Sequence, residues 1–269
     1  MIEIFKSASL KAGEVIMKFY QDNVEFSEKT DGSPVTKADQ AAEDVILSIL
    51  ASQLPQTPVV AEEAVASGSI PDYADEFILV DPLDGTKEFI NRNGEFTVNI
   101  ALIQNGRPVA GVIFAPALSE LYWGSEEHGA FFARVEAGNI VDPLPMKSRR
   151  GVDAIIGLGS RSHMTKETQA LVERCGVDEM IAAGSSLKFC RVAKGDADLY
   201  PRLGRTMEWD TAAGHAILLA AGGKVIDQGG EELAYGKREQ AHDSDFANPF
   251  FIAVGDEKII SKYDLSSGW

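Results

Sequence analysis

The chain has few of the residues on which several large protein classes depend. Its only two cysteines, Cys175 and Cys190, form neither a metal-type spacing nor a disulfide framework, which is typical of a reducing cytoplasm. No apolar run approaches the roughly 20 residues that a membrane-spanning helix needs. Basic residues are also scarce, with 25 Lys and Arg against 41 Asp and Glu. The net charge of −16 therefore argues against nucleic acid and anionic membranes as partners.

Several catalytic motifs are missing as well. The sequence contains no G-x-x-x-x-G-K-[ST] loop, no G-x-G-x-x-G after a strand, no G-x-S-x-G and no H-E-x-x-H. These absences disfavour P-loop nucleotide hydrolases, dinucleotide-binding enzymes, serine hydrolases of the nucleophile-elbow type and zinc proteases.

The first half predicts two helices on an antiparallel meander. Residues 1–20 have apolar side chains on one helical face and read as an amphipathic helix, not as a signal peptide. A second helix is expected over residues 36–55, with Thr36 as its N-cap and Asp39 three residues on. Strand-like runs follow at 57–61, 77–80, 96–103, 108–114, 120–124 and 129–133.

A Pro-rich, basic stretch, 142–151, predicts a boundary between an N-terminal α+β half, residues 1–145, and a C-terminal α/β half, residues 146–269. Beyond it, strands and helices alternate. Strands are expected at 153–160, 178–184, 196–202, 224–227 and 250–255, and helices at 165–176, 185–195 and 210–223.

The stretch Asp81–Phe89, DPLDGTKEF, places two carboxylates three residues apart behind an apolar strand. One interpretation is an ordinary Asp-Gly turn after a strand that Pro82 ends. The other is a functional site, because Gly85 allows close approach to its amide and Thr86 can start a helix whose free N–H groups suit an anion. Carboxylates beside an anion site require a hard cation between them, and Mg²⁺ is the usual one.

Three further acidic positions resemble helix caps or loops when taken singly. Glu62, beside Glu63, follows an apolar strand and could belong to a solvated loop. Asp210 opens a helix and could simply cap it, and Asp39 fits a capping box. Each could also direct an oxygen toward a metal ion or a water molecule, so both interpretations stay open here.

Two polar segments are candidates for anion binding. GSSLKF places Ser185, Ser186 and Lys188 at a predicted helix N-terminus, where a polar cap is the alternative. SRSH, at 160–163, is a polar, basic loop after a strand.

The order of these motifs resembles one family. SPVTKAD, VVAEE, DPLDGTKEFINRNGEFTVNIAL, GSSLKFC and EWDTAAGHA together are similar to the inositol monophosphatase superfamily of Mg²⁺-dependent, lithium-sensitive phosphatases, from about residue 7 to 255. GTKEF, RNGEFTVNIAL and SRSH are typical of its bisphosphate nucleotidase branch, whereas inositol-type members usually have G-T-x-N-F. The one small departure is Ala61, where the family usually has Ser before the two glutamates.

The resemblance implies roles for the matching positions. It implies two or three Mg²⁺ ions as cofactors. Their expected ligands are Glu62, Asp81, Asp84, Asp210 and the Leu83 carbonyl oxygen. The nucleophilic water would be held by Asp39 and Thr86, with Glu62 also catalytic. The substrate would contact Gly85, Thr86, Lys87, Arg161, His163, Ser185, Lys188, Arg202 and Asp210.

The resemblance also implies a fold and a reaction. The fold is a layered αβαβα sandwich of the sugar-phosphatase type, with the site between the two halves. The reaction is removal of the 3′-phosphate of adenosine 3′,5′-bisphosphate by metal-activated water, giving AMP and phosphate, within sulfur metabolism. Bound Mg²⁺ would let a phosphate dianion enter so acidic a protein. The partner is therefore a small molecule, and a homodimer stays open.

Three alternatives remain. The same chemistry could act on an inositol phosphate or a sugar bisphosphate. A haloacid-dehalogenase enzyme would use an aspartate nucleophile in D-x-D-x-T, but here the second aspartate stands at +3. A phosphate sensor without catalysis is disfavoured because both Asp39 and Thr86 are present.

Overall fold

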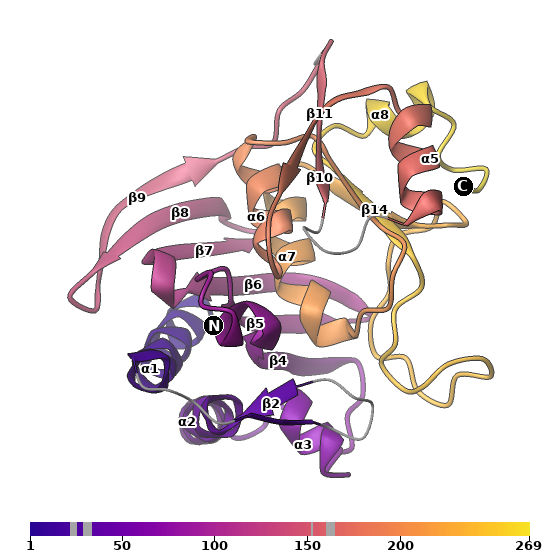
Figure 1. Ribbon diagram of the computed structural model, residues 1–269. Coiled ribbons are helices and arrows are strands. Elements are labelled where there is room, and N and C mark those ends of the chain that lie inside the picture. The colour runs from indigo at the N-terminus through magenta and orange to yellow at the C-terminus, as the bar shows by residue number, and fades with distance from the viewer. Residues whose placement is uncertain (22–25, 29–33, 152, 160–164) are drawn as a thin grey trace.

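The structure, a computed structural model, describes residues 1–21, 26–28, 34–151, 153–159 and 165–269. Five layers stack in the order helices, large sheet, helices, small sheet, helices (Figure 1). The predicted αβαβα sandwich is therefore confirmed.

The first layer consists of α1 (Ile2–Gln21) and α2 (Lys37–Gln53), which lie side by side on one face of the large sheet. Helix α1 buries Phe5, Ala8, Ala12 and Ile16 against the sheet, as its apolar stripe predicted. Helix α2 begins with the capping geometry expected from its sequence, because Thr36 and the third helical residue, Asp39, bond reciprocally.

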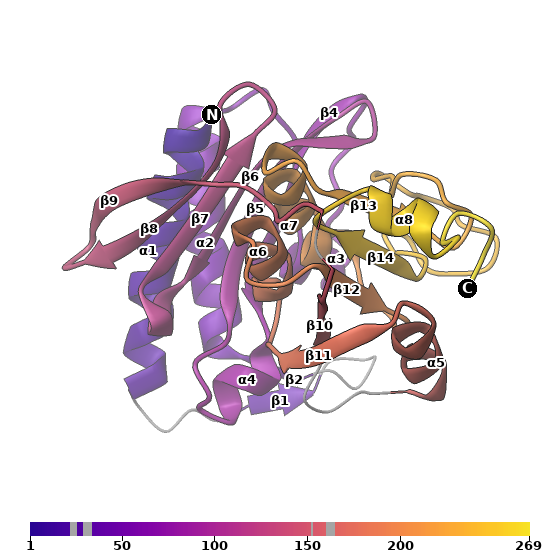
Figure 2. The ribbon, with the colours of Figure 1, turned by 90° about the horizontal axis from the view of Figure 1, so that it is seen from above.

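The large sheet has seven strands in sequence order (Figure 2). They are β3 (Val59–Ala61), β4 (Glu76–Asp84), β5 (Thr97–Gln104), β6 (Arg107–Ala115), β7 (Glu120–Ser125), β8 (Gly129–Glu136) and β9 (Asn139–Met146). Short elements accompany them: β1 (Phe26–Glu28) paired with β2 (Pro34–Thr36), α3 (Glu62–Ala66), α4 (Thr86–Ile90) and the 3₁₀ turn η1 (Pro116–Leu118).

Two details of the predicted meander are wrong. Strand β3 runs parallel to β4, because α3 and a long connection separate them. Part of the predicted boundary is strand, since β9 includes Pro143 and Pro145. Prolines are tolerated there because β9 is the last strand of the sheet and pairs only with β8. The division between residues 145 and 146 itself stays a prediction.

The middle layer is formed by α6 (Leu187–Lys194) and α7 (Glu208–Ala220), which pack between the two sheets. Close approach here depends on glycine. A Cβ atom at Gly111 of β6 would lie 2.5 Å from the Ala213 carbonyl oxygen, and one at Gly214 would lie 2.5 Å from the Phe189 ring. Helix α7 is consequently buried along most of its length and packs on β5 and β6 of the large sheet.

The small sheet has the order β11-β10-β12-β14-β13. Its strands are β10 (Ile155–Gly159), β11 (Val177–Ala182), β12 (Leu199–Arg202), β13 (Lys224–Asp227) and β14 (Phe251–Val254). Helices α5 (Lys166–Arg174) and α8 (Lys258–Lys262) form the last layer (Figure 1). No helix among the described residues is long and apolar enough to cross a membrane.

Candidate functional site

The site is organised around the end of β4. The strand's pairing with β5 is regular up to Asp81 and becomes irregular between Asp81 and Asp84. The Leu83 amide donates to Asp81 Oδ1 at 3.0 Å. Gly85 then adopts φ +89°, which a residue with a side chain rarely adopts, and α4 begins at Thr86. The predicted turn therefore exists, and it places both aspartates at one rigid strand end.

Asp84 is held in place by the chain's second half. Its Oδ2 accepts hydrogen bonds from the Ser186 amide at 2.6 Å and from Asn99 Nδ2 at 3.5 Å. Ser186 immediately precedes α6, so the first turn of that helix fixes the orientation of the carboxylate. Sequence reasoning missed Asn99 and assigned Ser186 only to a generic anion site.

Glu62 reaches the same region from β3. Ala61 pairs with Val80 in the parallel ladder, so the residues that follow each of them emerge side by side. The carboxyl group of Glu62 lies near that of Asp81 and raises its pKa. Glu62 and Glu63 begin α3, and Glu63 is buried, so the solvated-loop interpretation of this pair is wrong.

Asp39 and Thr86 form a pair across α2 and α4. Thr86 Oγ1 donates to Asp39 Oδ1 at 3.1 Å. The other oxygen, Oδ2, accepts from the Thr36 amide at 2.8 Å and from its hydroxyl at 2.7 Å. The capping role and the contact with Thr86 therefore coexist, because each uses a different oxygen. The predicted water-holding role of this pair stays a prediction.

Asp210 approaches the site from the middle layer. It is the third residue of α7, which begins at Glu208, two residues earlier than expected. Its Oδ2 accepts from the Met207 amide at 2.8 Å, a capping bond like that of Asp39.

These carboxylates affect one another strongly. Burial raises the pKa of Asp81 well above its usual range, and Glu62, Asp84 and Asp210 raise it further. Burial and the charges of Asp84 and Glu62 raise the pKa of Asp210 to about 8. Burial also raises the pKa of Asp84 to about 6, although Lys188 and the Ser186 amide oppose the rise. Four acidic groups thus share a volume in which they cannot all ionise without a compensating cation.

The donor chemistry fits a hard divalent cation. The candidate ligands are all oxygen atoms, which Mg²⁺ prefers, and their mutual repulsion would be relieved by its charge. As the side chains stand, no three His, Cys, Asp or Glu groups of the described residues form a ready-made metal cluster. The case for a divalent cation therefore rests on the oxygen chemistry of the candidate ligands and on the mutual repulsion of their negative charges.

The opposite wall carries hydrogen-bond donors and cations. Ser185 adopts φ +46°, and its hydroxyl lies 3.0 Å from the Asp84 carbonyl oxygen and 2.6 Å from that of Glu95. Lys188 Nζ donates to the Ala183 and Ser185 carbonyl oxygens at 3.3 and 2.6 Å. Burial lowers the pKa of Lys188 to about 8, with Asp84 opposing that effect. Ser185 is therefore positioned by both halves of the chain.

Glu95 forms a long-range contact with Gly184. In the sequence it served only as part of the RNGEF motif that is typical of the nucleotidase branch. Its Oε2 accepts from the Gly184 amide at 2.8 Å. A Cβ atom at Gly184 would lie 2.9 Å from both the Glu95 Cβ and its carbonyl oxygen. The RNGEF segment consequently fixes the turn before α6. The sequence gives no signal of this contact, because Glu95 and Gly184 are 89 residues apart.

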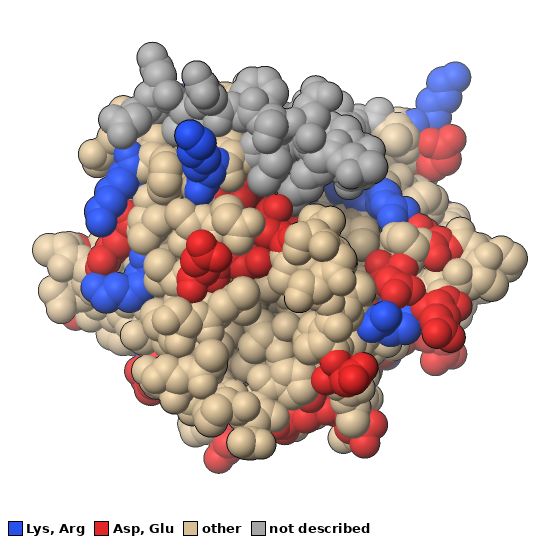
Figure 3. Space-filling view, turned by 90° about the horizontal axis from the view of Figure 1, so that it is seen from below, with Lys and Arg blue, Asp and Glu red and all other residues tan. Residues whose placement is uncertain are grey.

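The two walls enclose a cavity of about 230 Å³. Seven of its lining residues were sequence-predicted: Asp84, Gly85, Lys87, Ser185, Lys188, Arg202 and Asp210. Residues that the sequence analysis did not assign to the substrate also line it: Glu88, Gly184, Ser186, Phe189, Tyr200, Thr206 and Thr211. The predicted substrate contacts Arg161 and His163 lie outside the described residues. Figure 3 shows acidic side chains on this face of the molecule, in a central group and near its right edge, with Lys and Arg side chains among them.

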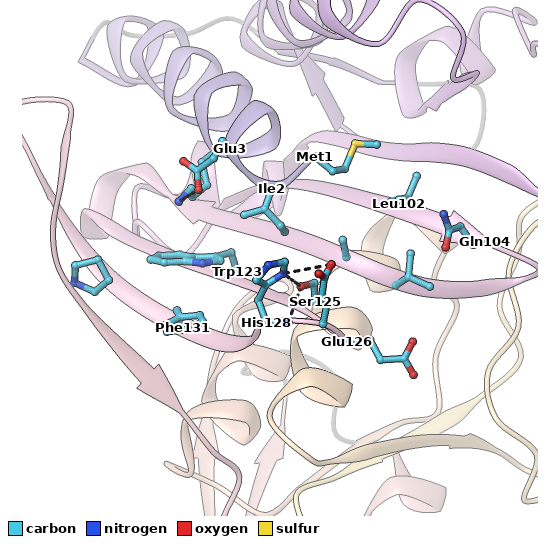
Figure 4. Close-up of a pocket in the computed structure, with 15 residues that line it drawn as sticks. Met1, Ile2, Glu3, Leu102, Gln104, Trp123, Ser125, Glu126, His128 and Phe131 are labelled. Carbon is cyan, nitrogen blue, oxygen red and sulfur yellow. Dashed lines mark hydrogen bonds and ion pairs between the residues drawn. The ribbon is translucent and has the colours of Figure 1, made fainter.

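A larger hollow, about 960 Å³, lies on the far side of the large sheet, where α1 begins. Figure 4 shows Trp123 and Phe131 along it, with His128 near Ser125. None of the candidate site residues lines this hollow. This hollow is larger than the cavity beside Asp84. We nevertheless place the candidate active site at the smaller cavity, because the buried carboxylates with raised pKa values cluster there.

Comparison with known proteins is consistent with this geometry. The model of the inositol monophosphatase family matches residues 1–255. The 3′(2′),5′-bisphosphate nucleotidase CysQ of Salmonella typhimurium is 44% identical over 253 residues, covering 93% of this chain and 98% of that protein. CysQ of Escherichia coli K12 is 43% identical, covering 89% and 94%.

Solved structures agree. The crystal structure of CysQ from Bacteroides thetaiotaomicron, described as a bacterial member of the inositol monophosphatase family, superposes with a TM-score of 0.76 at 41% identity, covering 94% of this chain and 96% of that one. The Thermotoga maritima IMPase superposes with a TM-score of 0.74 at 26% identity, covering 99% and 95%.

Proposed function

This chain belongs to the inositol monophosphatase family, and we propose that it is a metal-dependent 3′(2′),5′-bisphosphate nucleotidase that converts adenosine 3′,5′-bisphosphate to AMP and phosphate. The observation that carries the proposal is the convergence of Glu62, Asp81, Asp84 and Asp210 beside a cavity lined with hydroxyl groups and cations. The identity to CysQ proteins over nearly the whole chain supports the choice of substrate.

The metal ligands in this proposal are Glu62, Asp81, Asp84, Asp210 and the Leu83 carbonyl oxygen, and the expected number of Mg²⁺ ions is two or three. When bound, Mg²⁺ would acidify a water molecule and neutralise charge on the leaving oxygen.

The protein's own groups then position the reactants. Thr86 donates its only hydroxyl proton to Asp39, so both side chains can accept hydrogen bonds from one water molecule and leave its lone pair free for attack. The Gly85 and Thr86 amides stand at the start of α4, where they can donate to the phosphate that is removed.

The rest of the substrate would lie along the opposite wall. Ser185 and Lys188 supply polar donors there, and the buried Arg202 Nε has no protein partner in the described structure. Lys87 and Glu88 also line the cavity, so they stand where they can contact the nucleotide. By the resemblance, inositol-type members usually have Asn at the position of Glu88. Arg161 and His163 stay predicted contacts for the second phosphate, and a homodimer and a cytoplasmic location likewise stay predictions.

The experiment is a phosphate-release panel with Mg²⁺, with and without Li⁺. The panel contains the 3′,5′- and 2′,5′-bisphosphates of adenosine, the sulfated 3′-phosphate nucleotide, an inositol monophosphate and a sugar bisphosphate. We expect kcat/KM for an adenosine bisphosphate to exceed that for the inositol and sugar substrates by at least about tenfold. A preference for either of those two substrates would reject the nucleotidase assignment while leaving the family's chemistry intact.

The metal-ligand assignment has its own test. Asp84→Asn should lose measurable turnover at saturating Mg²⁺ while its far-UV circular dichroism stays that of the wild type. The exposed Asp44→Asn removes the same formal charge from α2 and should keep full activity. Activity of Asp84→Asn near the wild-type level would show that this carboxylate does not bind the metal.

A further inference from the structure

One buried carboxylate beside the site neither lines the cavity nor belongs to the predicted metal ligands. Glu43 lies on α2 and is 1% exposed. Its Oε2 accepts from the Glu63 amide at 2.8 Å, and its Oε1 accepts from the Ala64 amide at 2.8 Å. Both oxygens are thus used on consecutive backbone N–H groups of another element.

Those two amides belong to the first turn of α3, where backbone N–H groups have no partner within a helix. The N-cap residue, Ala61, has only a methyl side chain, so it makes no capping hydrogen bond to these amides. Glu43 therefore does from α2 what a local N-cap residue would do, and it ties the start of α3 to the long helix.

The start of α3 is also where Glu62 stands. Glu62 is the first residue of this helix, and its carboxyl group meets that of Asp81. With only five residues, α3 cannot hold its own geometry by internal hydrogen bonds. Its direction, and with it the direction of the Glu62 side chain, therefore depends on its contacts with neighbouring elements.

Helix α2 also orients a second short helix of the site, α4. Asp39 stands one helical turn before Glu43, on the same face, and bonds the hydroxyl of Thr86 at the start of α4. One rigid helix thereby orients two short ones through two buried carboxylates.

We propose that Glu43 is a positioning residue for the metal site, which fixes the first turn of α3 so that Glu62 faces Asp81. This proposal rests on the metal-dependent function proposed above. It assigns no contact between Glu43 and either metal or substrate, so its removal should weaken metal binding more than it slows the reaction once metal is bound.

The test compares Glu43→Gln with the matched control Asp44→Asn, which changes the adjacent, exposed carboxylate of the same helix. Glutamine keeps the size of the side chain but turns one acceptor into an NH₂ group, which would face a backbone N–H. We expect the Mg²⁺ concentration for half-maximal rate to rise about tenfold in Glu43→Gln, as is typical when a group that orients a metal ligand is removed. At saturating Mg²⁺, kcat and the KM for substrate should stay within about threefold of wild type, because Glu43 does not reach the cavity. Asp44→Asn should match wild type in all three constants.

A second measurement needs no catalysis. Titration calorimetry with Mg²⁺ alone should show the same tenfold weakening in Glu43→Gln, and Glu43→Ala should weaken binding further or to the same degree. Unchanged Mg²⁺ affinity in a folded Glu43→Gln protein, whatever its melting temperature, would overturn the proposal and leave Glu43 as a packing residue. A wild-type protein that binds Mg²⁺ but releases no phosphate would reject the proposed function and not this positioning role.

Discussion

Replacing Asp210 with asparagine should make the metal-free protein more stable while removing its activity. In the absence of metal, burial and the charges of Asp84 and Glu62 raise the pKa of Asp210 to about 8 from an ordinary value near 3.8. A carboxyl group whose pKa is higher in the folded than in the unfolded state binds protons more tightly when folded. It therefore costs stability that grows as pH rises from about 4 to about 8 and then levels off.

The magnitude follows from that shift. At pH 7 the full effect would be about 4 kcal/mol, since each pKa unit corresponds to about 1.4 kcal/mol. Because Asp210 keeps some exposure to solvent, screening reduces the expected gain to about 2 kcal/mol. Asparagine keeps an oxygen for the Met207 amide, which leaves the capping bond in place. For a chain of this length, about 2 kcal/mol corresponds to a rise in Tm of roughly 4 °C.

The assay is thermal unfolding of wild type and Asp210→Asn in a chelating buffer at pH 4, 6 and 8. The variant's advantage should be absent at pH 4 and largest at pH 8. Added Mg²⁺ should raise the Tm of wild type and reduce or reverse the difference, because only the wild type retains the full ligand set. Asp44→Asn controls for the change in net charge. A variant that melts below wild type at pH 8 without metal would refute the idea that the carboxylates repel one another in the folded state.

Other substitutions test single contacts. Gly85→Ala should lower the melting temperature and kcat together. The backbone φ at this position is +89°, and the new Cβ atom would lie 2.1 Å from Ser185 Oγ. A variant with wild-type stability would show that this turn can relax. Gly214→Ala should cost about 1–3 kcal/mol in denaturant unfolding, since its Cβ would overlap the Phe189 ring, and no loss would mean that the middle layer is loosely packed.

Much of this protein could be predicted from residue order alone. Helix α2 followed from Thr36 as its N-cap and Asp39 three residues on, and the structure has both residues in a capping box. Candidate site residues could be named because the motifs are local: DPLDGT sets two carboxylates and a glycine turn within six positions. Strand β9 was missed because its prolines look like breakers, and only its position at the sheet edge makes them acceptable.

Tertiary structure decided which of these local features act together. A capping aspartate has the same local pattern whether its second oxygen faces solvent or Thr86, so the sequence left Asp39 and Asp210 undecided. The meeting of Glu62 with Asp81 depends on the parallel pairing of β3 with β4, and the hold on Asp84 depends on Ser186, 102 residues away. The role of Glu43 was likewise out of reach, because its partners are backbone amides, which every residue except proline carries. Side-chain identity therefore determined the chemistry available, whereas long-range packing determined which groups are buried together and hence which pKa values rise.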